Sequence, residues 1–267
     1  TARAAVDVYR LTVHRPAARP VIVRTDAVVL RTLDYGETSQ IVALFTREYG
    51  LLSVIAKGSR RPKSRFGSTL QPLAYVQAVY YFREGRGLQT LKETAHVQRF
   101  ATLPLDLDRL TRGLRMLELV RALFEEGEPN PAVFNLLLRG LHWLDSAPER
   151  PSNGLCHVQL RLATLLGFAP DVRREDLEAL PEQGGVLRLG DGRIAPPEAA
   201  SKAGIRASRA ALRAFAIVAR TDLDTAARLA LDDATREETE HLVDAYLRYH
   251  VGDGYPTRVP KVARQLS

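Results

Sequence analysis

Short apolar runs separated by turn residues fill the chain from residue 21 to about residue 100 and predict a β-rich region. The segments Asp34-Tyr-Gly-Glu37 and Glu84-Gly-Arg-Gly87 supply the glycine and acidic residues typical of turns. The five predicted strands cover residues 21–33, 41–45, 51–56, 73–82 and 88–97. Five short strands in succession indicate a small closed barrel, although an SH3-like barrel or a five-stranded sandwich would give a similar pattern.

The strand predicted at residues 73–82 carries apolar side chains on both faces, because alternate residues of a strand point to opposite sides. The face predicted to line the core carries Ala74, Val76, Ala78, Tyr80 and Phe82. The opposite face carries Leu73, Tyr75, Gln77, Val79 and Tyr81. Two interpretations of Tyr75 and Tyr81 stay open, namely packing against the rest of the chain and stacking against the flat rings of a ligand.

From about residue 103 the apolar period changes from 2 to about 3.5, which predicts a helical bundle. Predicted helices cover residues 103–127, 131–144 and 155–166, and three more begin near Leu212, after Asp222 and at Thr235. Thr235 and Glu238 have the spacing of a capping box. The side chains predicted to be buried in this last helix are Leu242, Ala245, Tyr246 and Tyr249. Residues 171–207 are rich in glycine and proline and are predicted to be irregular.

Positive charge is concentrated in the predicted β-rich part of the chain. Residues 1–100 hold 16 Lys and Arg against 7 Asp and Glu, whereas residues 101–267 hold 22 against 24. No Asp or Glu occurs between residues 49 and 83. A solvated surface normally mixes both signs of charge, so this imbalance favours an anionic partner over an ordinary basic loop.

The pattern of cations and aromatic residues is typical of nucleic-acid binding, in which cations contact phosphates and flat rings stack on bases. The predicted phosphate contacts in the loop are Lys57, Arg60, Arg61, Lys63 and Arg65. Arg31 and Arg83 are secondary candidates, and Tyr75 and Tyr81 are candidates for stacking. No side chain in this set indicates sequence-specific contact with base edges, so weak sequence preference is expected.

No motif predicts an enzyme, a metal site or a bound cofactor. The chain lacks a P-loop, a Gly-x-Ser-x-Gly elbow and a His-Glu-x-x-His helix, and its histidines do not have the spacing of metal ligands. The single cysteine, Cys156, excludes a disulfide within the chain, fits a reducing cytosol and is predicted to be buried. No apolar run is long enough to cross a membrane. Residues 1–20 are predicted to be a mobile basic leader, or an arm that touches DNA, and not a secretory signal.

Several short strings occur in a fixed order between Val21 and His250. They are Val29-Leu-Arg31, Asp34-Tyr-Gly-Glu37, Ser39, Phe45-Thr-Arg-Glu-Tyr-Gly50, Ala56-Lys-Gly-Ser-Arg-Arg61, Lys63-Ser64, Leu70-Gln-Pro72, Leu165-Leu-Gly-Phe-Ala-Pro170 and Gly184-Gly-Val186. In these strings the chain resembles the bacterial RecO family of recombination-mediator proteins. The resemblance is specific in the N-terminal strings and looser in the C-terminal half.

The resemblance implies an α+β multidomain protein, with an N-terminal five-stranded OB-fold barrel at residues 21–101 and an α-helical domain at 102–255. An inserted loop region is expected at 169–207 and a C-terminal tail at 256–267. The implied activity is binding of single- and double-stranded DNA and annealing of complementary strands. With RecR, such a protein helps RecA load onto DNA coated by single-strand-binding protein. A cytoplasmic, nucleoid-associated location is therefore expected.

The resemblance also implies contact with the acidic C-terminal tail of single-strand-binding protein. A basic dock on the helical domain is expected among Arg109, Arg112, Arg115 and Arg121, although a solvated helix face is the favoured interpretation of these four. Many RecO proteins carry a four-cysteine zinc site in the insertion. The matching segments here, Asp171-Val-Arg-Arg-Glu-Asp176 and Val186-Leu-Arg-Leu-Gly190, contain no cysteine, so a zinc-ribbon-like insertion without zinc is predicted.

The sequence is therefore compatible with three hypotheses for function. A non-enzymatic DNA-binding recombination mediator is favoured. The alternative, from another class, is an OB-fold RNA-binding or assembly protein whose basic loop contacts ribosomal RNA. A hydrolase with an unrecognised site is the third, and no residue pattern supports it.

Overall fold

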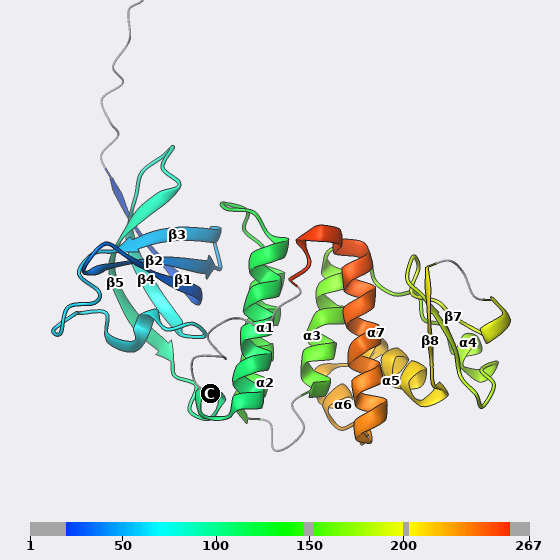
Figure 1. Ribbon diagram of the computed structural model, residues 1–267. Helices are drawn as coiled ribbons and strands as arrows, with labels where there is room; N and C mark the ends of the chain where they lie inside the picture. The colour runs from blue at the N-terminus through cyan, green and yellow to red at the C-terminus, as the bar shows by residue number, and fades with distance from the viewer. Residues whose placement is uncertain (1–19, 147–151, 200–202, 257–267) are drawn as a thin grey trace, which may run out of the picture.

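The structure is a computed structural model that describes residues 20–146, 152–199 and 203–256. Figure 1 shows three parts in a row: a β-barrel, a group of helices and a small sheet. Except for Pro20, the predicted leader lies outside the described residues, and so does the predicted tail after Pro256. No described helix is both long enough and apolar enough to cross a membrane.

The first part is a closed barrel of five strands in the order β1-β2-β3-β5-β4. The strands are β1 (Val21–Tyr35), β2 (Ser39–Thr46), β3 (Gly50–Ala56), β4 (Tyr75–Phe82) and β5 (Leu88–Gln98). The long β1 pairs with both β2 and β4, and a register shift between Val29 and Arg31 lets it turn from one partner to the other. A parallel pairing of β3 with β5 closes the ring, which is the strand order of the OB-fold and confirms that prediction.

The barrel encloses its own apolar core. Residues of the predicted inward face of β4, namely Val76, Ala78 and Tyr80, are completely buried there together with Phe66 and Leu91. The prediction was wrong for Phe82, which is exposed because it pairs with Val21 at the end of both strands, where the barrel no longer covers it. The alternation of a strand thus fixes the core only where neighbouring strands complete the ring.

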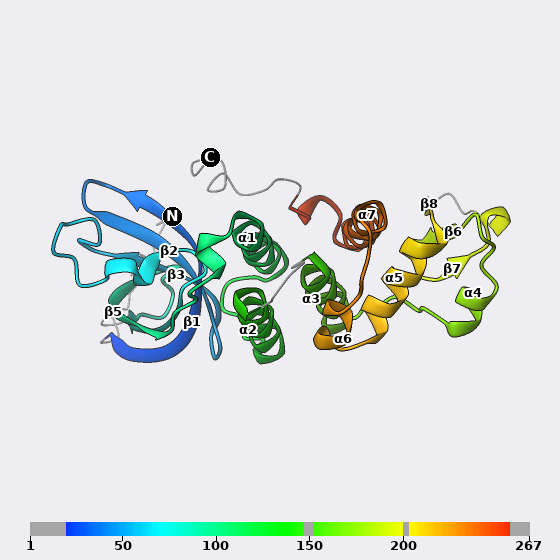
Figure 2. The same ribbon diagram turned by 90° about the horizontal axis from the view of Figure 1, so that it is seen from below.

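The second part is the helical bundle predicted from the 3.5-residue apolar period. Its helices are α1 (Leu107–Leu123), α2 (Pro131–Ser146), α3 (Ser152–Leu165), α5 (Arg209–Arg220), α6 (Leu223–Ala227) and α7 (Asp233–Val251). Short 3-10 turns precede α1 at Leu103–Leu105 and follow α7 at Gly252–Gly254. In Figure 2, α1 and α2 lie between the barrel and α3, and α5 and α7 lie beyond.

A continuous apolar core joins the barrel to the bundle. Phe45 of β2 and Tyr75 of β4 lie against Phe134 of α2, with ring centroids 6.1 and 6.3 Å away respectively. Gly50 lies under the α1–α2 connection with a φ of +66°, and a Cβ there would lie 2.0 Å from the Glu128 carbonyl oxygen. Only glycine fits this close approach. The outward face of the barrel is therefore divided between a side covered by helices and a side open to solvent.

The start of α7 differs from the prediction. The helix begins at Asp233, and the carboxylate of Asp232 accepts the backbone N–H of Thr235 at 2.7 Å as its N-cap. Glu238 does not complete a capping box; it accepts hydrogen bonds from the backbone and hydroxyl of Ser208, before α5. Tyr249, predicted to be buried, is exposed near the end of the helix.

The described residues of the insertion form regular elements, where the sequence pattern predicts an irregular loop. It contains a short helix α4 (Arg174–Glu178) and a three-stranded sheet, β6 (Gly185–Arg188), β7 (Ile194–Ala195) and β8 (Gly204–Ala207), in the order β7-β6-β8. A further 3-10 turn lies at Pro197–Ala199. Val186, Leu187 and Ile194 are buried, and Arg193 pairs with Asp176 at 2.8 Å. Apolar packing and this ion pair hold the insertion together.

Candidate nucleic-acid interface

The basic loop, residues 57–65, connects β3 to β4 on the side of the barrel away from the helices (Figure 1). Two successive turns shape it: the N–H of Arg61 donates to the Gly58 carbonyl and the N–H of Ser64 donates to the Arg61 carbonyl. The buried ring of Phe66 anchors its end, and the Arg65 guanidinium lies 5.1 Å from that ring. All five predicted phosphate contacts, Lys57, Arg60, Arg61, Lys63 and Arg65, are exposed.

Only Arg60 of this loop forms an ion pair with another of the described residues. Its guanidinium lies 3.4 Å from Asp34 in the β1–β2 turn, with the two side chains 41% and 60% exposed. The backbone N–H of Arg60 donates to the Thr38 carbonyl at 3.0 Å and fixes the loop against that turn. The positive charge of the other four cations is therefore uncompensated within the described part of the chain.

Beside the loop, a hollow of about 450 Å³ opens on the outer surface of the barrel. It is lined by Pro20, Lys57, Tyr81, Arg83, Arg86, Gln89 and Thr90. Strand pairing explains the grouping, because Tyr81 of β4 lies opposite Thr90 of β5, and Thr90 lies opposite Ile55, two residues before Lys57. The structure thus brings together Lys57, Tyr81 and Arg83, which the sequence had singled out separately.

Arg86 was not among the predicted contacts. It lies in the β4–β5 hairpin, within the string Glu84-Gly-Arg-Gly87, whose sequence predicts only a turn. The signal that could have identified it is its position three residues after Arg83 across a glycine turn. A hairpin places such residues on opposite sides of one tip.

Two predicted residues lie elsewhere. Arg31 is exposed on β1 opposite Ala43 of β2 and does not line the hollow. Tyr75 is 8% exposed, its ring packs edge-on against Phe134, and its hydroxyl lies 3.2 Å from Asp26. Burial, with the Asp26 charge beside it, raises the pKa of Tyr75. A base cannot reach this ring, so Tyr75 belongs to the contact between barrel and bundle and not to the interface.

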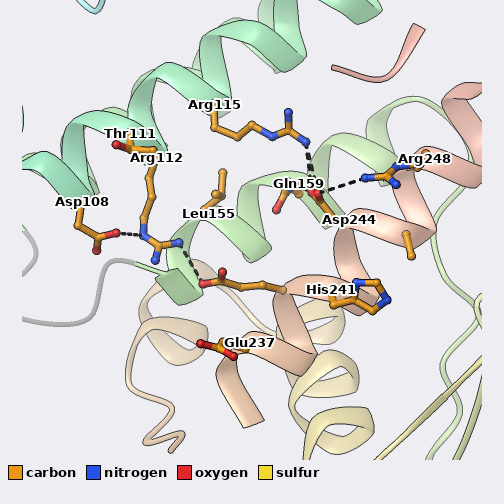
Figure 3. Close-up of a pocket in the computed structure, with 12 residues that line it drawn as sticks. Asp108, Thr111, Arg112, Arg115, Leu155, Gln159, Glu237, His241, Asp244 and Arg248 are labelled. Atoms are coloured by element: carbon orange, nitrogen blue, oxygen red, sulfur yellow. Dashed lines mark hydrogen bonds and ion pairs between the residues drawn. The ribbon is translucent and has the colours of Figure 1, made fainter. Parts of the chain in front are cut away.

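A second group of cations lies in a groove of about 500 Å³ between α1, α3 and α7 (Figure 3). There Arg112 pairs with Asp108 at 2.9 Å and with Glu240 at 3.0 Å, and Arg115 pairs with Asp244 at 3.3 Å. Arg115 also donates to the Pro256 carbonyl. The other two arginines expected at a basic dock are also engaged, because Arg109 donates to the Leu144 carbonyl and Arg121 pairs with Glu118. These cations serve the bundle's own packing.

Comparison with known proteins then decides the family. The model of the recombination protein O N-terminal domain matches residues 21–100, and that of the recombination protein O C-terminal domain matches residues 104–258. The chain is 53% identical to the DNA repair protein RecO of Salinibacter ruber over 93% of its own length and 96% of that protein. It is 29% identical to the DNA repair protein RecO of Chloroherpeton thalassium, over 92% and 99% of the two chains. The chain belongs to the RecO family of DNA repair proteins.

The described residues of this RecO-family chain contain neither a reactive thiol nor a group that could hold a metal ion. Cys156 is buried on α3, as predicted, and burial strongly raises the pKa of its thiol, so the thiol is a poor nucleophile. Within the described residues, no three His, Cys, Asp or Glu side chains lie together in a way that could hold a metal ion. Within the described part of the chain, the exposed cations Lys57, Arg61, Lys63 and Arg65 form no ion pair.

Proposed function

We propose that this RecO-family protein binds single- and double-stranded DNA through the exposed face of its barrel and acts without any catalytic step. The proposed contacts are Lys57, Arg60, Arg61, Lys63 and Arg65, with Arg83 and Tyr81 beside them and Arg31 as an outlying contact. The observation that carries the proposal is the lack of ion pairs, within the described residues, at Lys57, Arg61, Lys63 and Arg65. Such cations release the counterions condensed on phosphates when DNA binds.

The same surface supports annealing of complementary strands. Two DNA strands repel one another through their phosphates, and a basic surface that holds both lowers this repulsion and raises their local concentration. Base pairing then supplies the driving force, so the protein needs neither a nucleotide nor a metal ion.

The partners proposed for this chain follow the family to which it belongs. With RecR, the protein would help RecA replace single-strand-binding protein on DNA, in the bacterial cytoplasm at the nucleoid. The acidic tail of single-strand-binding protein remains the proposed ligand of the helical domain. Because Arg112 and Arg115 already pair with carboxylates, such a tail would have to compete with Glu240 and Asp244 for them.

The test is a titration of fluorescent single-stranded oligonucleotides across salt concentration. The five cations of residues 57–65 contribute about −3.5 to the slope of log K against log[salt], at about −0.7 for each contact. The variant Arg61→Ala/Lys63→Ala/Arg65→Ala should flatten this slope by about 2 and weaken binding at low salt. Thermal unfolding should change little, because these three side chains are exposed, form no ion pair with described residues, and only Arg65 lies over an aromatic ring.

The matched control removes the same charge elsewhere. Arg173→Ala/Arg174→Ala/Arg188→Ala eliminates three arginines of the insertion, each of which pairs with a nearby carboxylate. This control should leave the salt slope unchanged. An equal loss of affinity in both variants would show that net charge alone, and not the barrel face, attracts DNA. Annealing assays with complementary DNA and RNA strands separate the proposed function from the RNA-binding alternative.

A further inference from the structure

We propose that the hollow beside the β4–β5 hairpin is a subsite for one unpaired nucleotide of a single strand. Tyr81 stacks on its base, and Lys57, Arg83 and Arg86 hold the phosphates on either side. This inference rests on the proposed DNA binding by the barrel, and it assigns to one place on that surface a preference for single-stranded over duplex DNA.

The two hairpin arginines are held in place by a buried amide. The side chain of Gln89 is 3% exposed. Its Oε1 accepts the backbone N–H of Arg83 at 2.8 Å, and its Nε2 donates to the carbonyls of Arg83 and Arg86. The N–H of Arg86 also donates to the Arg83 carbonyl at 3.3 Å. The backbone on both sides of the hairpin tip is therefore fixed before any ligand binds, which lowers the entropic cost of binding.

The cations of the hollow come from two separate connections and have no opposing charge among the residues that line it. Lys57 follows β3, whereas Arg83 and Arg86 flank the tip between β4 and β5. No Asp or Glu is among the lining residues, and within the described chain none of these three cations forms an ion pair. Three converging, unpaired cations are a site for anionic groups such as phosphates.

The ring of Tyr81 provides the surface for a base. It lies on the outer side of β4 between Ile22 of β1 and Thr90 of β5, and its side chain is half-buried and lines the hollow. An aromatic ring beside cations is the combination that binds unpaired bases without regard to sequence. The volume of about 450 Å³ lies within the range of roughly 300–1,000 Å³ typical of sites for small organic groups.

Duplex DNA cannot use this subsite fully, because the faces of its bases are covered by their neighbours. Extruding a paired base costs a few kcal/mol, whereas a base in a single strand is already accessible. The cations of residues 60–65, in contrast, do not line the hollow, are exposed to solvent and can contact the phosphates of either form. The barrel surface therefore divides into a loop indifferent to strandedness and a hollow that selects a single strand.

The experiment compares the variant Tyr81→Leu with the native protein in binding a fluorescent oligothymidine and a duplex of equal length. Loss of one stacked base should weaken single-strand binding by about 5- to 150-fold, which corresponds to 1–3 kcal/mol. Duplex binding should be unchanged. The conservative variant Tyr81→Trp should retain single-strand affinity. Tyr249→Leu, which alters an exposed tyrosine on α7, is the matched control and should change neither affinity.

A second variant keeps the inference testable if Tyr81→Leu does not fold. Arg86→Gln removes one charge from an exposed side chain and should reduce the single-strand salt slope by about 0.7 without changing the duplex slope. Equal losses for both forms of DNA, or no loss for either, would overturn the subsite. The wider proposal fails separately, if charge removal at Arg61, Lys63 and Arg65 leaves both affinities unchanged.

Discussion

Two regions of the molecule carry clusters of basic side chains, and they differ in how many of these side chains have an acidic partner. In the groove between α1, α3 and α7, the side chains of Arg112 and Arg115 are 17% and 13% exposed and each pairs with a carboxylate. On the barrel, the cations of residues 57–65 are exposed, and among the described residues only Arg60 has an acidic partner. Both clusters contain several arginines, and what differs is the charge of the side chains beside them.

The comparison teaches that the partner of a cation decides what its charge can do. A partly buried guanidinium paired with a carboxylate is desolvated, and the carboxylate neutralises its charge, so it attracts an external anion only weakly. A solvated cation without a partner keeps its long-range field and can exchange water and counterions for a phosphate. Arginine in the bundle therefore contributes to stability, whereas arginine on the barrel is available for DNA.

The largest expected effect is at Arg112. Replacement by Met keeps much of the volume but leaves Glu240 and Asp108 without their cation, so the free energy of unfolding should fall by about 1–3 kcal/mol. Urea unfolding at neutral pH measures this change. Affinity for DNA, determined by the same oligonucleotide titration, should stay the same.

The matched substitution on the barrel, Arg61→Met, should behave in the opposite way, with weaker DNA binding and unchanged stability. The double variant Arg112→Met/Glu240→Gln tests the mechanism further, because removing the stranded carboxylate should restore part of the lost stability. If Arg112→Met weakened DNA binding as much as Arg61→Met does, the two groups of cations would not differ in function.

A second difference concerns pH and involves His157 in the bundle. This side chain is 5% exposed, and burial lowers its pKa, while a hydrogen bond to the Val218 backbone raises it. The charges of Arg161 and Arg139 lower the pKa further, and the Asp222 carboxylate raises it. The unfolded chain therefore binds a proton near pH 6.5 that the folded chain does not yet bind, so stability is lost as the pH falls below about 6.5.

For one proton, this loss amounts to at most about 1.4 kcal/mol per pH unit. The variant His157→Gln should flatten the dependence of unfolding free energy on pH as the pH falls below about 6.5. His96 of the barrel, whose pKa burial also lowers, contributes in the same direction and remains in the variant, so a residual slope is expected. An unchanged slope would mean that His157 binds its proton equally well in the folded and unfolded chains.

Much of the barrel could be predicted from the sequence, because each strand alternates between side chains that face the shared interior and side chains that face outward. Val76, Ala78 and Tyr80 were predicted inward and are buried, since the neighbouring strands close over them. Whether an outward-facing side chain of the barrel is covered by a helix or exposed to solvent depends on residues far away in the sequence. Tyr75 and Tyr81 have equivalent positions in the pattern, yet α2 covers the first and not the second.

The remaining differences have similar causes. Arg112 and Glu240 are 128 residues apart, so the sequence does not indicate that they pair. Both Asp232 and Thr235 are good N-cap residues, and the choice between them depends on Glu238 being engaged by Ser208. In the insertion, strands of two to four residues are too short for alternation to stand out among glycines and prolines.

The smallest expected effect is at Asp34, the one acidic residue among those described that pairs with the basic loop. An exposed ion pair of this kind is worth about 0.2–1 kcal/mol. Asp34→Asn would remove the competing carboxylate and leave Arg60 attached to the turn through its hydrogen bonds to backbone carbonyls. DNA affinity at low salt should therefore rise by up to about fivefold, because Arg60 no longer has to exchange the Asp34 carboxylate for a phosphate. Glu178→Gln, which frees Arg174 in the insertion, is the control and should leave the affinity unchanged.

A fall in affinity in Asp34→Asn would instead show that the carboxylate holds Arg60 in the position from which it contacts DNA. The contrast between paired and unpaired cations would then not extend to Arg60.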